Sequence, residues 1–331
     1  MSGVPRDGNP DSGRSGRRRR GRGERAMVPD AEFASYYGRP VLKRSEWKPL
    51  DVAGYLWMGG LAGASSLLAA GAQVTARPAL ARTAKLGAAG AVSLSLAALV
   101  HDLGRPGRFL YMLRVFKPTS PMSVGSWLLA GYAPLTMAAA AADVAGRYRI
   151  VGAAATASAA ALGPAVATYT AVLICDTAVP SWHEGYREMP FAFAGSGATA
   201  AAGLALAAVP PEQTGPARRA AVLGAVLELG AFRLMKRNMG LAAEAYERGR
   251  PRIWLRAAEA LTAGGAALAA GAGRHRVLGA LAGTALLAGS AALRLGVFHA
   301  GVASAEDPRY TVVPQRERLT ARERTADPRS P

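Results

Sequence analysis

Two polar stretches, residues 101–127 and 176–193, interrupt otherwise apolar sequence and hold most of the side chains that could do chemistry. The first joins His101 and Asp102 to several bases and aromatic rings. The second is rich in ionisable and aromatic side chains: Asp176, Trp182, His183, Glu184, Tyr186, Arg187 and Glu188. Acids and histidines beside a bilayer can relay protons or hold a polar headgroup, whereas aromatic rings often only anchor a protein at the membrane interface. We therefore expect functional ionisable side chains in these loops, and we interpret the aromatic side chains of the second stretch first as interfacial anchors.

Asp102 is the acid whose position is hardest to explain by structure alone. The apolar segment before it predicts a helix that ends at residue 103, and the negative C-terminal end of a helix dipole disfavours an acid. Asp102 is therefore expected either to pair with Arg105 or Arg108 or to accept a proton. The bases of this stretch also predict a docking surface for a partner protein: Arg105, Arg108, Arg114 and Lys117.

Apolar segments of membrane-spanning length must position these loops. A helix of about 20 apolar residues crosses a bilayer. Eight segments meet this need: 51–73, 83–103, 123–142, 150–174, 190–209, 217–234, 255–272 and 277–298. Apolar residues make up 50% of the chain and aromatic ones only 7%, as expected for helices that pack through Ala and Gly in lipid. The sequence predicts an all-α integral membrane protein with eight transmembrane helices.

Two details of these segments qualify the prediction. The sixth segment is the weakest, because Glu228 and Arg233 interrupt it. Gly59 and Gly63 in the first segment form a GxxxG pair, which in so Gly-rich a chain predicts general helix packing rather than a dimer interface.

The charge distribution predicts the topology and the domains. The expected parts are a disordered basic cytoplasmic tail, a membrane domain and a flexible cytoplasmic tail, at residues 1–33, 34–302 and 303–331. Loops on the side of the tails carry more bases than the opposite loops, so the positive-inside rule places both termini in the cytoplasm and the protein in the inner (plasma) membrane. Arg77, Arg82 and Lys85 lie on the opposite side and weaken this bias. Much of the net charge of +18 belongs to the N-terminal tail and the loops, so no nucleic-acid partner is expected.

Cysteine and histidine usually bind redox metals, and their small number and their positions in this sequence predict no resident metal. The single cysteine, Cys175, excludes an iron–sulfur cluster held by this chain alone. Haem within a helix bundle needs two histidines at matching depth on facing helices. His183 and His275 are predicted in loops on opposite sides, so only His101 and His299 could pair, and we expect no haem.

A lipid-soluble quinone suits the polar groups better. A quinone needs an apolar cleft, one or two polar groups that bond its carbonyls, and a route for the two protons that its reduction takes up. Candidate groups are expected at one membrane face: Tyr55, His101, Asp102, Tyr169, Asp176, His183 and Glu184. The quinone, menaquinone or ubiquinone, is expected to be a substrate rather than a resident cofactor.

Three segments carry a family resemblance: residues 54–71 (GYLWMGGLAGASSLLAAG), 101–127 (HDLGRPGRFLYMLRVFKPTSPMSVGSW) and 169–195 (YTAVLICDTAVPSWHEGYREMPFAFAG). They resemble the NrfD/PsrC family, the polysulfide-reductase-type membrane subunits of molybdoenzyme complexes. The resemblance implies an eight-helix, haem-free, quinone-binding subunit built as two four-helix bundles. It also implies two partners, an iron–sulfur protein with four cubane clusters and a molybdopterin oxidoreductase.

The resemblance extends to single residues. By motif position Tyr169 resembles the family's fourth-helix tyrosine near the quinone headgroup. Tyr55 lies about where the family has a polar first-helix residue that assists this tyrosine at the headgroup. Asp102 and Arg105 match the family's DLGRP motif. Some members place a histidine in the first helix, and this chain has none there.

The expected function is therefore that of a membrane anchor and quinone-reactive subunit of a multi-subunit oxidoreductase. An ion-translocating or transporter-like subunit is the alternative, and it predicts charged groups near the bilayer midplane. A purely structural anchor is a third possibility, which requires no polar cleft.

Overall fold

Helices are the only regular elements among the residues that the computed structural model describes. These are residues 42, 48–102, 107, 111–273 and 275–326. All of them belong to one unit, residues 37–331. The predicted all-α class is confirmed for this part of the chain. The predicted N-terminal tail lies outside the described residues.

Each of the eight predicted apolar segments overlaps one long helix. Their bounds are Pro49–Val74 (α1), Pro78–Asp102 (α2), Pro121–Ala145 (α4), Arg149–Cys175 (α5), Met189–Ala208 (α7), Gly215–Asn238 (α8), Gly249–Gly271 (α10) and Arg276–Glu306 (α11). Short helices lie in the connections: Pro180–His183 (α6), Pro211–Gln213 (η1), Gly240–Ala243 (η2) and Glu244–Glu247 (α9).

Proline explains where several of these helices begin. Pro49, Pro121 and Pro190 lie in the first turns of α1, α4 and α7. A proline there removes an N–H group that has no partner within the helix, and its fixed φ suits the helix. Pro134 and Pro164 lie inside α4 and α5 without ending them. Interior prolines of this kind are tolerated in membrane helices, where neighbouring groups satisfy the freed carbonyls.

Six of the described helices are long and apolar enough, by length and composition, to cross a membrane: α1, α2, α4, α5, α7 and α11. α8 and α10 cover the sixth and seventh predicted spans but do not meet this measure. Charged residues interrupt both, including Glu228 and Arg233 in α8 and Arg256 and Glu259 in α10. The sequence had already indicated the weakness of the α8 segment.

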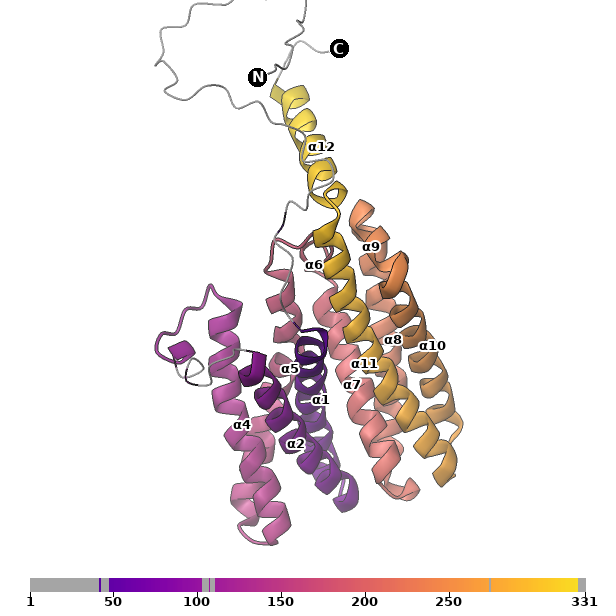
Figure 1. The fold of residues 1–331 in the computed structure, drawn as a ribbon. Helices are drawn as coiled ribbons and strands as arrows, with labels where there is room; N and C mark the ends of the chain where they lie inside the picture. Colours follow the sequence, from indigo (N-terminus) through magenta and orange to yellow (C-terminus); the bar gives the residue numbers. More distant parts are fainter. Residues whose placement is uncertain (1–41, 43–47, 103–106, 108–110, 274, 327–331) are drawn as a thin grey trace, which may run out of the picture. The chain divides into compact units, whose positions relative to one another are not determined.

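The long helices pack in two sets that share one pattern of contacts. In the first set, α1 and α4 each pack against both α2 and α5. In the second set, α7 and α10 each pack against both α8 and α11. The sets meet where α1 and α5 contact α7. Figure 1 shows the α1–α2, α4–α5, α7–α8 and α10–α11 connections at one end and α6 and α9 toward the other.

Glycine lets helices of each set approach to backbone contact. A Cβ at Gly63 of α1 would lie 2.4 Å from the Gly163 carbonyl oxygen of α5. The matching approach in the second set joins α7 and α11, where a Cβ at Gly283 would lie 2.4 Å from the Gly203 carbonyl oxygen. No side chain fits at such a distance, so Gly63 of the predicted GxxxG pair serves helix packing within the chain.

The segment after residue 302 contains more regular structure than its sequence indicated. α11 continues to Glu306, and a further helix, α12, covers Arg309–Ala326. This part lacks an apolar period, but α12 contains five Arg residues, which favour helix, and it contacts α6 and η2. The predicted flexibility of this tail stays a prediction.

Gly63→Ala is expected to destabilise the fold. The new Cβ would meet the α5 backbone at Gly163 and Ala167, and overpacking of this kind costs about 1–3 kcal/mol. Gly71 lies on the same helix with no atom within 4 Å of the corresponding Cβ position. Gly71→Ala is therefore the matched control, expected to be neutral or slightly stabilising. Thermal unfolding in detergent checks this, and equal melting temperatures for the two variants would contradict it.

Candidate functional site

A cluster of polar side chains lies among α1, α2 and α5. Tyr55 of α1 is buried in the apolar core, with 7% of its surface exposed. It lies within electrostatic range of Asp102 at the end of α2 and of Tyr169 on α5, although no hydrogen bond joins it to either side chain. Three of the side chains that the sequence predicted for one membrane face are therefore neighbours in the structure.

Small side chains on the adjoining helices make room for this cluster. A Cβ at Gly125 of α4 would lie 2.5 Å from Cε2 of Tyr169, so the tyrosine ring occupies the space that glycine leaves. Ser95 of α2 donates a hydrogen bond of 3.1 Å to the Tyr55 carbonyl oxygen and holds α2 against α1. Tyr169 is partly exposed, and its hydroxyl makes no hydrogen bond to any described residue. No described residue therefore competes with a ligand for this phenol.

Two buried polar atoms on α1 and α5 also have no hydrogen-bond partner among the described residues. They are Thr170 Oγ1 and Trp57 Nε1. Thr170 is fully buried next to Gly59, which lies about one helical turn from Tyr55. Buried polar atoms are normally paired, and unpaired ones need an explanation. A ligand with carbonyl oxygens would satisfy such donors, so the residues present fit a quinone.

Ionisable groups connect this cluster with the protein surface. His101 Nδ1 lies 3.0 Å from Asp51 Oδ2, and the imidazole is 64% exposed. Asp102 interacts electrostatically with Asp51, Lys48 and His101. Asp102 therefore lies near both the exposed His101–Asp51 pair and the buried Tyr55, with no hydrogen bond to either among the described residues. The predicted pairing of Asp102 with Arg105 or Arg108 lies outside the described residues.

The second polar stretch is held in place by Trp182, for which interfacial anchoring was the wrong interpretation. The indole is 1% exposed and donates a hydrogen bond of 2.7 Å to the Val297 carbonyl oxygen of α11. The Tyr246 hydroxyl of α9 donates to the Ser181 carbonyl oxygen at 2.8 Å. Burial raises the pKa of Tyr246, which keeps this donor proton in place. Tyr186, in contrast, is 52% exposed, as an interfacial anchor requires.

Most ionisable side chains of this stretch lie at the surface, but Glu188 is buried and accepts a hydrogen bond of 2.6 Å from Asn238 Nδ2. His183 Nδ1 lies 3.2 Å from the Cys175 carbonyl oxygen at the end of α5. Cys175 follows Tyr169 at a distance of about 9 Å along the helix axis. Asp176, His183 and Glu184 are exposed, and no described contact joins them to Tyr169. The predicted site is therefore brought together only in part.

The described part of the first polar stretch exposes bases and apolar rings side by side. The Arg114 guanidinium lies 4.9 Å from the centre of the Tyr111 ring. Phe116 packs edge-on against Trp127, although 58% of Phe116 is exposed. Exposed apolar side chains that adjoin charged ones are typical of interaction surfaces. Of the predicted docking residues, Arg114 and Lys117 are exposed, whereas Arg105 and Arg108 lie outside the described residues.

A second polar centre lies inside the second set of helices. Glu228 of α8 is 1% exposed and Arg294 of α11 is 0% exposed; the two lie within electrostatic range, although no ion pair or hydrogen bond joins their side chains. Glu228 accepts hydrogen bonds from Thr262 at 3.0 Å and from Thr199 at 3.2 Å. Arg294 lies over the Phe193 ring at 3.6 Å and donates to the Phe193 carbonyl oxygen.

Sequence reasoning found Glu228 but overlooked Arg294. The signal was present, because Arg294 interrupts the predicted span 277–298 and charge inside a span is costly and usually functional. Two guanidinium nitrogens of Arg294, Nε and Nη1, are buried without a hydrogen-bond partner among the described residues.

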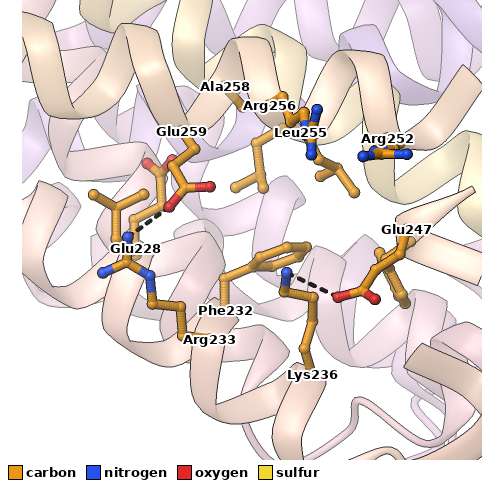
Figure 2. Close-up of a pocket in the computed structure, with 13 residues that line it drawn as sticks. Glu228, Phe232, Arg233, Lys236, Glu247, Arg252, Leu255, Arg256, Ala258 and Glu259 are labelled. Atoms are coloured by element: carbon orange, nitrogen blue, oxygen red, sulfur yellow. Dashed lines mark hydrogen bonds and ion pairs between the residues drawn. The ribbon is translucent and has the colours of Figure 1, made fainter. Parts of the chain in front are cut away.

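A cavity of about 460 Å³ between α8 and α10 reaches Glu228. Figure 2 shows two ion pairs along it, Arg233–Glu259 at 2.5 Å and Lys236–Glu247 at 3.4 Å. The exposed side chains of Arg252 and Arg256 lie at its α10 wall (Figure 2). Phe232, Leu255 and Leu293 supply apolar lining. The cavity therefore joins a charged rim to a buried carboxylate.

Comparison with known proteins decides the family. A family model described as "Polysulphide reductase, NrfD" matches residues 44–210, just over half of the chain. The chain belongs to the NrfD family. The predicted resemblance is confirmed, and together with the six apolar helices it identifies a multi-pass membrane protein. No curated protein matches the chain.

The NrfD match covers one of the two polar centres. Residues 44–210 contain the Tyr55 cluster and both polar stretches. Glu228, Arg294 and most of the second set of helices lie beyond it. The Tyr55 cluster is therefore the centre that family membership bears on directly.

Arg294→Met is expected to destabilise the protein more than the double variant that removes both buried ionisable groups, Glu228 and Arg294. Glu228 would remain buried without its counter-ion, which costs about 3–5 kcal/mol. The double variant Glu228→Gln/Arg294→Met leaves no buried charge and should recover most of that loss. Arg233→Met, which breaks an exposed ion pair, is the control and should cost about 0–1 kcal/mol. Thermal unfolding of the four proteins measures this coupling, and additive losses in the double variant would refute it.

Proposed function

We propose that this NrfD-family protein is the membrane anchor and quinone-reactive subunit of a multi-subunit oxidoreductase. The cluster of Tyr55, Asp102 and Tyr169 carries the proposal, because it lies in the NrfD region beside the buried Thr170 hydroxyl, which has no described partner. The proposed partners are an iron–sulfur subunit with four clusters and a molybdopterin catalytic subunit, as the family resemblance implies. Electrons pass between that iron–sulfur subunit and membrane quinone.

The proposed chemistry assigns hydrogen bonding and proton transfer to this chain. Reduction of a quinone to a quinol consumes two electrons, which the partner's clusters supply, and two protons. Tyr169 donates a hydrogen bond to one quinone carbonyl, because its phenol has no other described partner. Tyr55 and Asp102 pass protons inward from the exposed His101–Asp51 pair.

The exposed groups of the second polar stretch have a supporting role in this proposal. Asp176, His183 and Glu184 collect protons at the surface beyond the end of α5. The quinone is menaquinone or ubiquinone, and the chain itself holds neither haem nor an iron–sulfur cluster.

The proposed docking face is the end of the protein that carries both polar stretches. Arg105, Arg108, Arg114 and Lys117 are proposed to contact the iron–sulfur subunit. We propose that this end and both termini lie on the cytoplasmic side of the plasma membrane, because an excess of bases favours that side. Exposed Tyr111 and Phe116 would supply apolar contact area beside the described bases.

The proposed architecture has eight transmembrane helices in two four-helix bundles. The two sets of helices with matching contacts support the bundles. α8 crosses the membrane despite its charges, since Glu228 faces Arg294 inside the protein. The outer face of α8 is apolar, with Leu223 70% and Val226 68% exposed. These side chains are suited to contact with lipid.

Ion translocation is the alternative function. The buried Glu228–Arg294 pair and the cavity that reaches it favour this alternative, because charged groups deep in a helix bundle mark ion and proton pathways. Proton movement that accompanies quinone turnover and disappears in Glu228→Gln would establish the alternative as an additional activity.

Tyr169→Phe is expected to leave assembly of the complex intact and to slow quinone turnover at least tenfold, a barrier change of about 1.4 kcal/mol. The change removes the donor but keeps the ring that packs against Gly125. Tyr148→Phe is the matched control, since Tyr148 lies exposed at the other end of α5 and should show wild-type turnover. Wild-type turnover in an assembled Tyr169→Phe complex would refute the site. Loss of assembly instead would assign Tyr169 a packing role.

Cysteine labelling tests the proposed topology. The single native cysteine is buried, so background labelling of intact cells should be low. Lys117→Cys is expected to react with a membrane-impermeant maleimide only after the cells are broken. Arg219→Cys, at the opposite end of the helices, is expected to react in intact cells. The reverse pattern would overturn the orientation.

A further inference from the structure

A broad basic cavity lies at the end of the first set of helices opposite the polar stretches. It has a volume of about 1060 Å³ and lies between the α1–α2 and α4–α5 connections. Its lining contains five basic side chains and a single carboxylate: Arg77, Arg82, Lys85, Arg147, Arg149 and Asp143. Three of these bases, on the side opposite the tails, are the ones that weakened the predicted positive-inside bias.

The single carboxylate leaves most of this positive charge unbalanced. Asp143 Oδ1 lies 3.1 Å from Lys85 Nζ, and its Oδ2 lies 3.8 Å from Arg82 Nε. Arg77 donates one weak hydrogen bond, of 3.4 Å, to the Glu212 carbonyl oxygen, and its Nε is buried without a partner among the described residues.

Two arginines of the cavity are fully available to a ligand. Arg147 and Arg149 are exposed and form no ion pair with any described residue. The cavity also receives the N-terminal turns of α2 and α5, whose dipoles are positive there and add to the attraction for an anion.

Apolar side chains beside the cavity indicate that the anion belongs to a lipid. Val74 is 87% exposed at the end of α1, and Ile150 is 86% exposed at the start of α5. Val144, at the end of α4, and Val151, at the start of α5, are both 58% exposed. A soluble anion gains nothing from such neighbours, whereas acyl chains would cover them.

We propose that this cavity binds the phosphate of an anionic phospholipid. Arg147 and Arg149 hold the phosphate, with Arg77 beside them, while the acyl chains lie against the exposed side chains of α1, α4 and α5. Basic pockets between membrane helices recognise anionic headgroups in this way. The site is separate from the Tyr55 cluster, and it does not depend on the quinone proposal or on which side of the membrane it faces.

Native mass spectrometry of the purified full-length chain tests this proposal. The chain is mixed with equal amounts of phosphatidylglycerol and phosphatidylcholine, and retention of each lipid is measured. The wild type is expected to retain the anionic lipid about tenfold better, and Arg147→Gln/Arg149→Gln should lose this preference. Arg218→Gln/Arg219→Gln is the matched control, because it removes the same charge at the same end without touching the cavity lining and should retain the preference.

Three outcomes would overturn the proposal. Equal retention of the two lipids by the wild type would do so without any variant. Wild-type preference in the Arg147→Gln/Arg149→Gln protein would exclude these arginines. Displacement of the lipid by inorganic phosphate at comparable concentration would identify a soluble anion as the ligand. If the double variant does not fold, the single variants Arg147→Gln and Arg149→Gln should each retain about threefold less phosphatidylglycerol, and unchanged retention in both would refute the site.

Discussion

Backbone contact between helices at glycine is the interaction on which the rest of the structure depends. In lipid, helices gain little from hiding apolar surface, so close van der Waals contact must hold them together. The Gly63–Gly163 contact provides it between α1 and α5, and the second set repeats it between α7 and α11. Because Tyr55 and Tyr169 lie on α1 and α5, the same contact brings the two phenols together.

Close packing of small residues also determines how charge can be buried. A Cβ at Gly195 would lie 2.4 Å from the Glu228 backbone nitrogen, so α7 and α8 touch beside this carboxylate. Threonine hydroxyls on α7 and α10 then reach Glu228, and Arg294 approaches it from α11. Glu228, which weakened the prediction that α8 spans the membrane, therefore makes contacts inside the second set of helices. Its carboxyl group is hydrogen-bonded within the protein rather than exposed to lipid.

The two ends of the helices carry different chemistry. One end holds the polar stretches, the His101–Asp51 pair and the exposed rings of the first stretch, which suit redox partners and proton uptake. The other end holds short connections and a basic cavity. The bases at that second end weaken the charge difference on which the positive-inside rule depends. The proposed binding of a lipid phosphate explains their presence there independently of topology. Buried Trp182 fixes the second polar stretch, so the exposed His183 is carried on a rigid support.

The sequence by itself determined the all-α class, the positions of the long helices and the family, because apolar length, first-turn prolines and the DLGRP motif are local features. It also named Tyr55, Asp102 and Tyr169 as candidates, although their roles remain proposals. Only the tertiary structure decided that these three are neighbours, that Trp182 is buried and that Arg294 faces a carboxylate. These facts depend on which face of one helix meets another. Long runs of Ala, Gly and Leu have too weak a periodicity to specify that face, since nearly every side of such a helix is apolar.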